Sequence, residues 1–148
     1  MQSERANVLP SLFSAMVDQQ WDKMPSYFTE SATWEVRPKS AVERFPGKGD
    51  FDVQQRIESF KVIRSDFLGD SAELKVNYFV QGDEASASRL SSRGTTRDGH
   101  PFEMEFIIFL EYEKGGSRIK RAIEMVDSAY LLDHINRMKG SSTNGGKA

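Results

Sequence analysis

A long alternation of side chains, from Phe102 to Tyr112, is the feature that most constrains how this chain can fold. Its even-numbered positions are all apolar: Phe102, Met104, Phe106, Ile108, Leu110 and Tyr112. The other face is apolar only at its middle, at Ile107 and Phe109. A period of two predicts a strand, here over 102–113, and apolar residues on both faces are typical of a central strand. The turn sequence KGGS at 114–117 predicts that residues 118–127 return antiparallel to it.

Three further stretches have the pattern of strands. Residues 73–80 alternate, and Leu74, Val76, Tyr78 and Val80 are predicted to form the better-buried face. Residues 86–96 form a weaker strand, rich in Ser and Arg, which ends before Asp98-Gly99, a strong hairpin signal. Residues 32–37 form a short strand that Pro38 ends, with a turn expected just before it at 29–31.

Helices are predicted on both sides of these strands. Apolar residues at three-to-four spacing indicate a helix over 5–20, and a short second helix restarts near Asp22. Asp50 is expected to cap a third helix. A last helix carries an apolar stripe at 131–138 and is expected to end at Gly140, followed by a disordered tail over 141–148.

Together these elements predict one α+β domain over residues 1–140, in which a curved, mainly antiparallel sheet is covered on one face by helices. A sheet wrapped in this way leaves a cavity between helices and strands, and that cavity is the expected ligand site.

Composition narrows the possible functions. The chain has 148 residues, a net charge of −2, no cysteine and two histidines, so we expect no nucleic-acid partner and no metal site. It lacks a phosphate loop, a dinucleotide fingerprint and a nucleophile elbow, so no cofactor is expected. Without a signal sequence or an apolar run long enough to span a bilayer, it is expected to be cytoplasmic and away from membranes.

Three stretches carry a resemblance to a known family: WDKMPSYFTESATWEV at 21–36, RPKS at 37–40, and GTTRDGHPFEMEFIIFLEYEKGGSRIKRAIEMVDSAY at 94–130. In these the chain resembles the nuclear transport factor 2-like superfamily, a cone-shaped α+β roll, and within it the SnoaL-like branch of fungal natural-product pathways. The resemblance covers about residues 5–139. Relatives often carry histidines in the segment occupied here by Trp34-Glu35-Val36, so the resemblance does not extend to a histidine base there.

The resemblance implies a cofactor-independent isomerase or cyclase that acts on a bulky, oxygenated natural-product intermediate, for example by a semipinacol-type rearrangement. It also implies a working pair, one basic residue on the first strand and one acidic residue on the last. Arg37 and Glu124 stand at these places.

The residues themselves support Glu124 and leave Arg37 open. Glu124 lies among apolar neighbours, which predicts a side chain that points into the cavity and can transfer a proton. A surface ion pair is its alternative role. Arg37 offers five donors to a substrate oxygen, or else forms an ion pair with Glu35.

Other candidates have structural alternatives. Asp127 is a possible base but stands where a helix N-cap is needed. Tyr112 could reach a ligand or solvent, and His100, beside the hairpin turn, could be a base or solvated. The expected substrate-binding wall consists of Trp34, Phe102, Met104, Phe106 and Ile108.

Two other functions stay open at this point. One is a polyketide-type aldol cyclase or dehydratase with Asp127 or His100 as base. The other is a non-catalytic module for ligand binding or dimerisation, which a cavity filled by side chains would favour. Ile107 and Phe109, if they face outward, suit a sheet-to-sheet homodimer.

Overall fold

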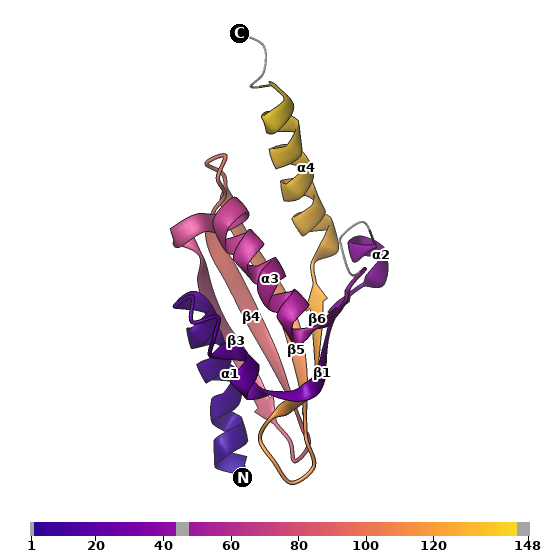
Figure 1. Ribbon diagram of the computed structural model, residues 1–148. Helices are drawn as coiled ribbons and strands as arrows, with labels where there is room; N and C mark the ends of the chain where they lie inside the picture. Colours follow the sequence, from indigo (N-terminus) through magenta and orange to yellow (C-terminus); the bar gives the residue numbers. More distant parts are fainter. Residues whose placement is uncertain (1, 44–47, 145–148) are drawn as a thin grey trace.

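The computed structural model describes residues 2–43 and 48–144. One six-stranded sheet curves around the helices, in the strand order β2-β1-β6-β5-β4-β3 (Figure 1). The strands are β1 (Phe28–Arg37), β2 (Asp50–Asp52), β3 (Glu73–Gln81), β4 (Ala85–Thr95), β5 (Pro101–Tyr112) and β6 (Ile119–Val126). The helices are α1 (Gln2–Val17), α2 (Lys39–Val42), α3 (Val53–Ile63) and α4 (Ser128–Asn144), with a 3₁₀ turn at Met24–Tyr27, a π-helical turn at Arg64–Leu68 and a 3₁₀ turn at Gly69–Ser71.

The predicted α+β class and mainly antiparallel sheet are confirmed. β5 lies inside the sheet, antiparallel to both β4 and β6, and its even-numbered residues are buried as the alternation predicted. β1 runs parallel to β6, with Trp34 opposite Ala122 and Val36 opposite Glu124. This pairing brings the first long strand and the last one side by side in the sheet.

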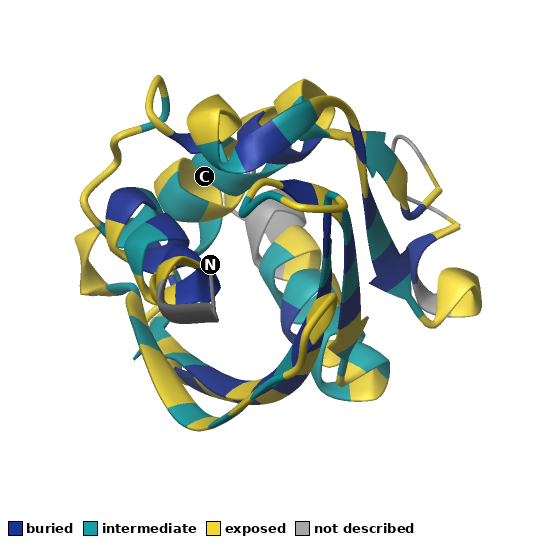
Figure 2. Cartoon of the chain, turned by 90° about the horizontal axis from the view of Figure 1, so that it is seen from below, coloured by how far each residue is buried: buried dark blue, intermediate teal, exposed yellow. Residues whose placement is uncertain are grey.

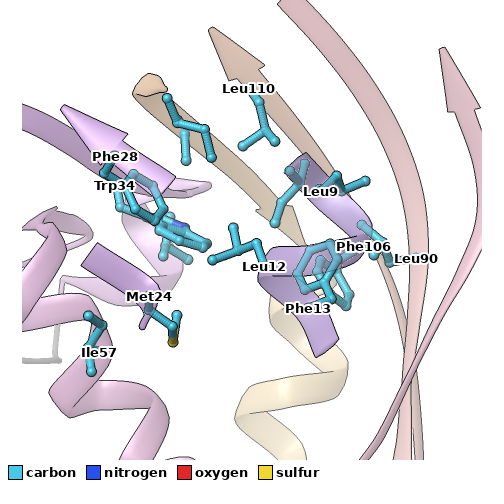
Figure 3. Close-up of a cluster of buried hydrophobic side chains, with 14 of the residues drawn as sticks. Leu9, Leu12, Phe13, Met24, Phe28, Trp34, Ile57, Leu90, Phe106 and Leu110 are labelled. Atoms are coloured by element: carbon cyan, nitrogen blue, oxygen red, sulfur yellow. The ribbon is translucent and has the colours of Figure 1, made fainter. Parts of the chain in front are cut away.

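The concave face of the sheet and the inner faces of the helices form the core. Leu9, Leu12 and Phe13 of α1 pack near Leu90 and Phe106 of the sheet (Figure 3). Viewed along the cone, the sheet forms an arc with α1 inside it (Figure 2). Among the described residues, no helix is both long enough and apolar enough to cross a membrane.

The start of α3 differs from the prediction. Asp52, not Asp50, is its N-cap: Asp52 Oδ1 accepts from Gln55 N at 2.8 Å, and Gln55 Oε1 accepts from Asp52 N at 2.9 Å. This reciprocal capping box fixes where the helix begins. Asp50 instead lies in β2, a short strand that pairs with β1 and that the sequence pattern did not indicate.

Irregular pairing changes two predicted faces. Between Val76 and Tyr78 the register of β3 against β4 shifts, so Phe79 is half-buried while Tyr78 is 63% exposed. The prediction that Tyr78 and Val80 belong to the better-buried face was therefore wrong, because one extra residue reverses every side chain beyond it; Val76, which precedes the shift and lies opposite Leu90, is 37% exposed. A similar register shift occurs between β5 and β6 at Glu111 and Tyr112. It places Ile119 opposite Tyr112 and buries it, although uninterrupted alternation along β6 would put Ile119 on the outer face with Arg121.

Two predicted ends were also wrong. β1 begins at Phe28, so residues 29–31 are strand and not turn. α4 continues past Gly140 to Asn144, since Gly140 does not adopt the positive φ by which a glycine ends a helix. The remainder of the expected tail, 145–148, lies outside the described residues.

Candidate functional site

A cavity of about 1260 Å³ lies between the inner face of the sheet, α3 and α4. Most of its wall is apolar. Phe102, Met104 and Phe106 line it as predicted. Trp34 and Ile108 do not: each is 1% exposed and belongs to the packed core. The cavity is open and not filled by side chains, so the condition that would have favoured a non-catalytic module is not met.

Glu124 brings a carboxylate into this apolar wall. It lies on the inner face of β6 and is 6% exposed, as its apolar neighbours predicted. Its Oε2 accepts two hydrogen bonds, from Arg56 Nη2 at 2.7 Å and from Trp34 Nε1 at 3.0 Å. Oε1 has no hydrogen-bond partner among the described residues. Oε2 is therefore held by two donors, and Oε1 remains able to accept a further hydrogen bond or a proton.

Arg56 is the partner of Glu124, and its charge is enclosed by aromatic rings. Its Cζ lies 4.0 Å from the ring centre of Phe60, 5.5 Å from that of Phe51 and 5.7 Å from that of Trp34. Nη1 donates to Ser59 Oγ at 2.7 Å. Ring faces attract a cation, and confinement limits the conformations that the guanidinium can adopt. The pair is thus held rigidly, with both side chains less than 10% exposed.

The predicted pairing of Arg37 with Glu124 is not formed. Arg37 follows Val36, which faces the cavity, so its own side chain points to the other side of β1. There its Nη2 donates to Glu35 Oε1 at 2.7 Å and to Asp50 Oδ1 at 2.8 Å. The cation beside Glu124 comes from α3 instead of β1.

A signal for Arg56 was present in the sequence. The apolar stripe that predicts α3 consists of Val53, Ile57 and Phe60, and position 56 lies three residues after the first and four before the last. Residues so spaced share a helix face. A charged residue inside an apolar stripe marks a buried charge, and this one points at the cavity.

The other predicted candidates lie off the cavity wall. Asp127 is a helix cap, because its Oδ1 accepts from Tyr130 N at 3.1 Å. Tyr112 is buried beneath Arg5 and its hydroxyl lies 3.0 Å from Ser86 Oγ; burial raises its pKa. The side chain of His100 is 54% exposed and lies 3.3 Å from Asp98. None of the three lines the cavity.

A second polar cluster joins α4 to the β4–β5 hairpin at the rim of the cavity. Arg137 donates from Nε to Asp98 Oδ2 at 2.7 Å and from Nη2 to Asp98 Oδ1 at 3.1 Å, which holds the pKa of Asp98 well below its usual range. His134 Nδ1 lies 2.9 Å from Arg137 Nη1. A guanidinium can only donate, so this nitrogen accepts and the proton of the neutral ring is on Nε2. Burial lowers the pKa of His134.

The described residues contain no group of three or more His, Asp or Glu side chains placed to hold a metal ion. Glu124, Arg56 and Ser59 form one connected polar group in the cavity wall. They can bind an oxygen, accept a proton and return it.

Sequence comparison finds no family model that matches this chain, and no curated protein sequence that matches it. Comparison of structures does find similar folds. A pinacolase, BvnE from Penicillium brevicompactum, is 21% identical, with a TM-score of 0.78 over 96% of this chain and 99% of that one. IdmH, a putative polyketide cyclase from Streptomyces antibioticus, is 18% identical, with a TM-score of 0.72 over 89% and 98%.

A third similar structure is an NTF2-like protein of unknown function from Burkholderia pseudomallei, 13% identical, with a TM-score of 0.74 over 89% of this chain and 97% of that one. At such identities the likeness concerns the fold. The chain thus has the nuclear transport factor 2-like fold that the sequence predicted. The similar structures include a pinacolase and a putative polyketide cyclase, the kinds of protein that the SnoaL-like resemblance implied.

Proposed function

We propose that this protein is an isomerase or cyclase of secondary metabolism, which rearranges or closes a ring in a bulky, mainly apolar, oxygenated intermediate with its own side chains as acid and base. The observation that carries the proposal is the carboxylate of Glu124, buried in an apolar cavity with Oε2 held by Arg56 and Trp34 and Oε1 free.

Glu124 moves the proton. Oε2 is held by Arg56 and Trp34, so Glu124 accepts a proton from the substrate at Oε1 and then returns it. In a semipinacol-type shift the proton leaves a substrate hydroxyl, a carbon–carbon bond migrates to the adjacent carbonyl carbon, and the new alkoxide takes the proton back. Substrate and product have the same composition, and no other reactant is needed.

Arg56 supports the charge that develops in this step. Its guanidinium lies 2.7 Å from the carboxylate, so a substrate oxygen that approaches Oε1 gains negative charge near a fixed cation. General acid–base catalysis contributes about 10² to 10⁴-fold in rate, and electrostatic preorganisation adds several kcal/mol. The apolar wall adds selection of one reactive conformer. The similarity in fold to a pinacolase and to a putative polyketide cyclase agrees with this class of reaction.

Turnover by a Glu124→Gln variant tests the proposal. Wild type and variant are incubated with a panel of polycyclic α-hydroxyketones, and products are separated by chromatography with mass detection. We expect wild type to give a product of unchanged mass, and the variant, folded by circular dichroism, to be at least about a hundredfold slower. Equal turnover by both would remove Glu124 from the mechanism. A product lighter by one water would instead indicate a dehydratase.

We also propose that the active species is a homodimer joined through the convex face of the sheet. That face carries Ile107, Phe109 and Met125, which are 40%, 41% and 41% exposed, and Tyr78 and Val80 of β3 lie on the same face across β4. Apolar side chains that cluster on one exposed face mark a contact surface. A second copy presents the same patch, so the two faces match by symmetry.

A further inference from the structure

Arg64 is a mostly buried cation that lines the cavity far from Glu124. It begins the π-helical turn that follows α3, and its side chain is only 16% exposed. Its contacts are loose: Nη1 lies 3.4 Å from the carbonyl oxygen of Ala72, and Nη2 lies 3.8 Å from Asp70 Oδ1. The Asp70 carboxylate is itself fully exposed, so water screens it.

Several other arginines are held more tightly, and Arg97, whose carboxylate partner lies at 3.9 Å, is 65% exposed to water. Arg37, Arg118 and Arg137 each have a carboxylate oxygen within 2.9 Å. Arg56 has Glu124 at 2.7 Å. A guanidinium that is largely removed from water, without a close counter-ion, loses solvation that its loose contacts do not replace. A hydrogen bond from Arg64 to a ligand oxygen would replace this lost solvation.

The spacing of Arg56 and Arg64 along the helix sets the distance between these two cations. Eight residues separate them along α3 and its continuation, which corresponds to roughly 12 Å at the rise of a helix. Both line the same cavity, and Phe60 and Ile63, which lie between them on the helix, line it too. A ligand that reaches both ends therefore has an apolar body of about that length. Arg56 is already paired with Glu124 at 2.7 Å, so of these two cations Arg64 is the one left to pair with an anion of the ligand.

We propose that Arg64 is a second binding point of the cavity and takes a carboxylate of the ligand, at roughly 12 Å from the end held by Glu124 and Arg56. The planar guanidinium suits a carboxylate because it can donate two parallel hydrogen bonds. The proposal deepens the proposed function by naming the substrate class, an elongated apolar acid. It rests on the proposed function only in assigning the reaction to the Glu124 end of the ligand.

Binding of decanoate and of 1-decanol, measured by calorimetry, tests this inference without any turnover. The two probes share an apolar chain and differ only in the charged end. We expect wild type to bind decanoate more tightly than decanol. Arg64→Met is expected to weaken decanoate binding by roughly tenfold or more and to leave decanol within about twofold, because only the charge-assisted hydrogen bonds are lost.

Arg93→Met is the matched control, since Arg93 pairs with Glu103 on the outer face and does not line the cavity. It should leave both affinities unchanged. Arg64→Lys keeps the charge without the planar group and should bind decanoate with intermediate affinity. If Arg64→Met weakens both probes equally, or neither, the carboxylate site is refuted. The binding assay involves no turnover, so a failure of the proposed catalytic role leaves this result independent.

Discussion

Arg56 and Glu124 form an ion pair of 2.7 Å inside the cavity although 68 positions separate them in the chain. Three structural elements produce this contact. The antiparallel turn from β5 places Glu124 on the inner face of β6, β1 pairs alongside in parallel, and the capping box at Asp52 fixes the start of α3 so that Arg56 faces the sheet. The pair is therefore a product of the whole fold.

Arg56→Lys is expected to reduce kcat by about tenfold or more while the protein remains folded. Lysine keeps the charge but loses the planar group that fits between the rings and donates to both Glu124 and Ser59. Arg56→Met is a poorer test, because it leaves Glu124 as an unpaired buried charge, at a cost of about 3–5 kcal/mol. Turnover and urea unfolding of Arg56→Lys should be measured together. An unchanged kcat would show that Arg56 has only a structural role.

Arg37→Ala separates the sequence-based expectation from the structure. Arg37 pairs with Glu35 and Asp50 outside the cavity, so we expect turnover within about threefold of wild type and a loss of stability of about 1 kcal/mol or less, as for a surface ion pair. The measurements are kcat and the free energy of unfolding. Loss of turnover in a folded Arg37→Ala would return the catalytic role to the first strand.

Trp34→Phe tests how far the orientation of the carboxylate matters. The change removes the N–H that donates to Glu124 Oε2 and keeps most of the ring against Phe28 and Phe60. Trp34 does not line the cavity, so KM should stay constant while kcat falls by several-fold, about the worth of one hydrogen bond to a charged group. A rise in KM at constant kcat would indicate that Trp34 shapes the pocket and does not position the base.

Asp98→Asn is expected to weaken the attachment of α4 in a pH-dependent manner. Hydrogen bonding from Arg137 lowers the pKa of Asp98 in the folded state, so the carboxylate stabilises the fold above the ordinary pKa of an aspartate, about 4, and this contribution is lost as the pH falls toward the lower folded value. Thermal unfolding should show a lower Tm for the variant at pH 7. The difference from wild type should shrink below pH about 4. A constant difference across this range would contradict the assignment.

Phe109→Glu tests the proposed dimer. The substitution places a charge at the middle of the exposed apolar patch, where a second copy would bury it. Sedimentation should give a dimer for wild type and a monomer for the variant. Glu105→Gln, four residues earlier on the same outer face, is the control and should stay dimeric. A wild-type monomer at all concentrations would refute the interface.

The sequence was informative where a side-chain pattern has one structural cause. The alternation from Phe102 to Tyr112 determined β5, the Asp98-Gly99 turn determined its hairpin, and the apolar neighbours of Glu124 determined its burial. The fold class followed from the order of such elements. Alternation, turn residues and apolar neighbours are local properties of the sequence, and the packing of the core agrees with them.

Other features depended on how elements meet. The register shift in β3 leaves Tyr78 exposed, and Asp50 lies in β2 instead of capping α3. Arg37 lies on the outer face of β1, where it binds Glu35 and does not reach Glu124. Alternation predicts the two faces of a strand but does not reveal where an extra residue shifts its register against the next strand. Helical spacing predicts an apolar helix face but not which strand that face will cover. The sequence by itself determined that a buried carboxylate stands on the last strand. Only the tertiary structure decided that its partner is Arg56, because a contact over such a separation requires the packing of α3 on the sheet.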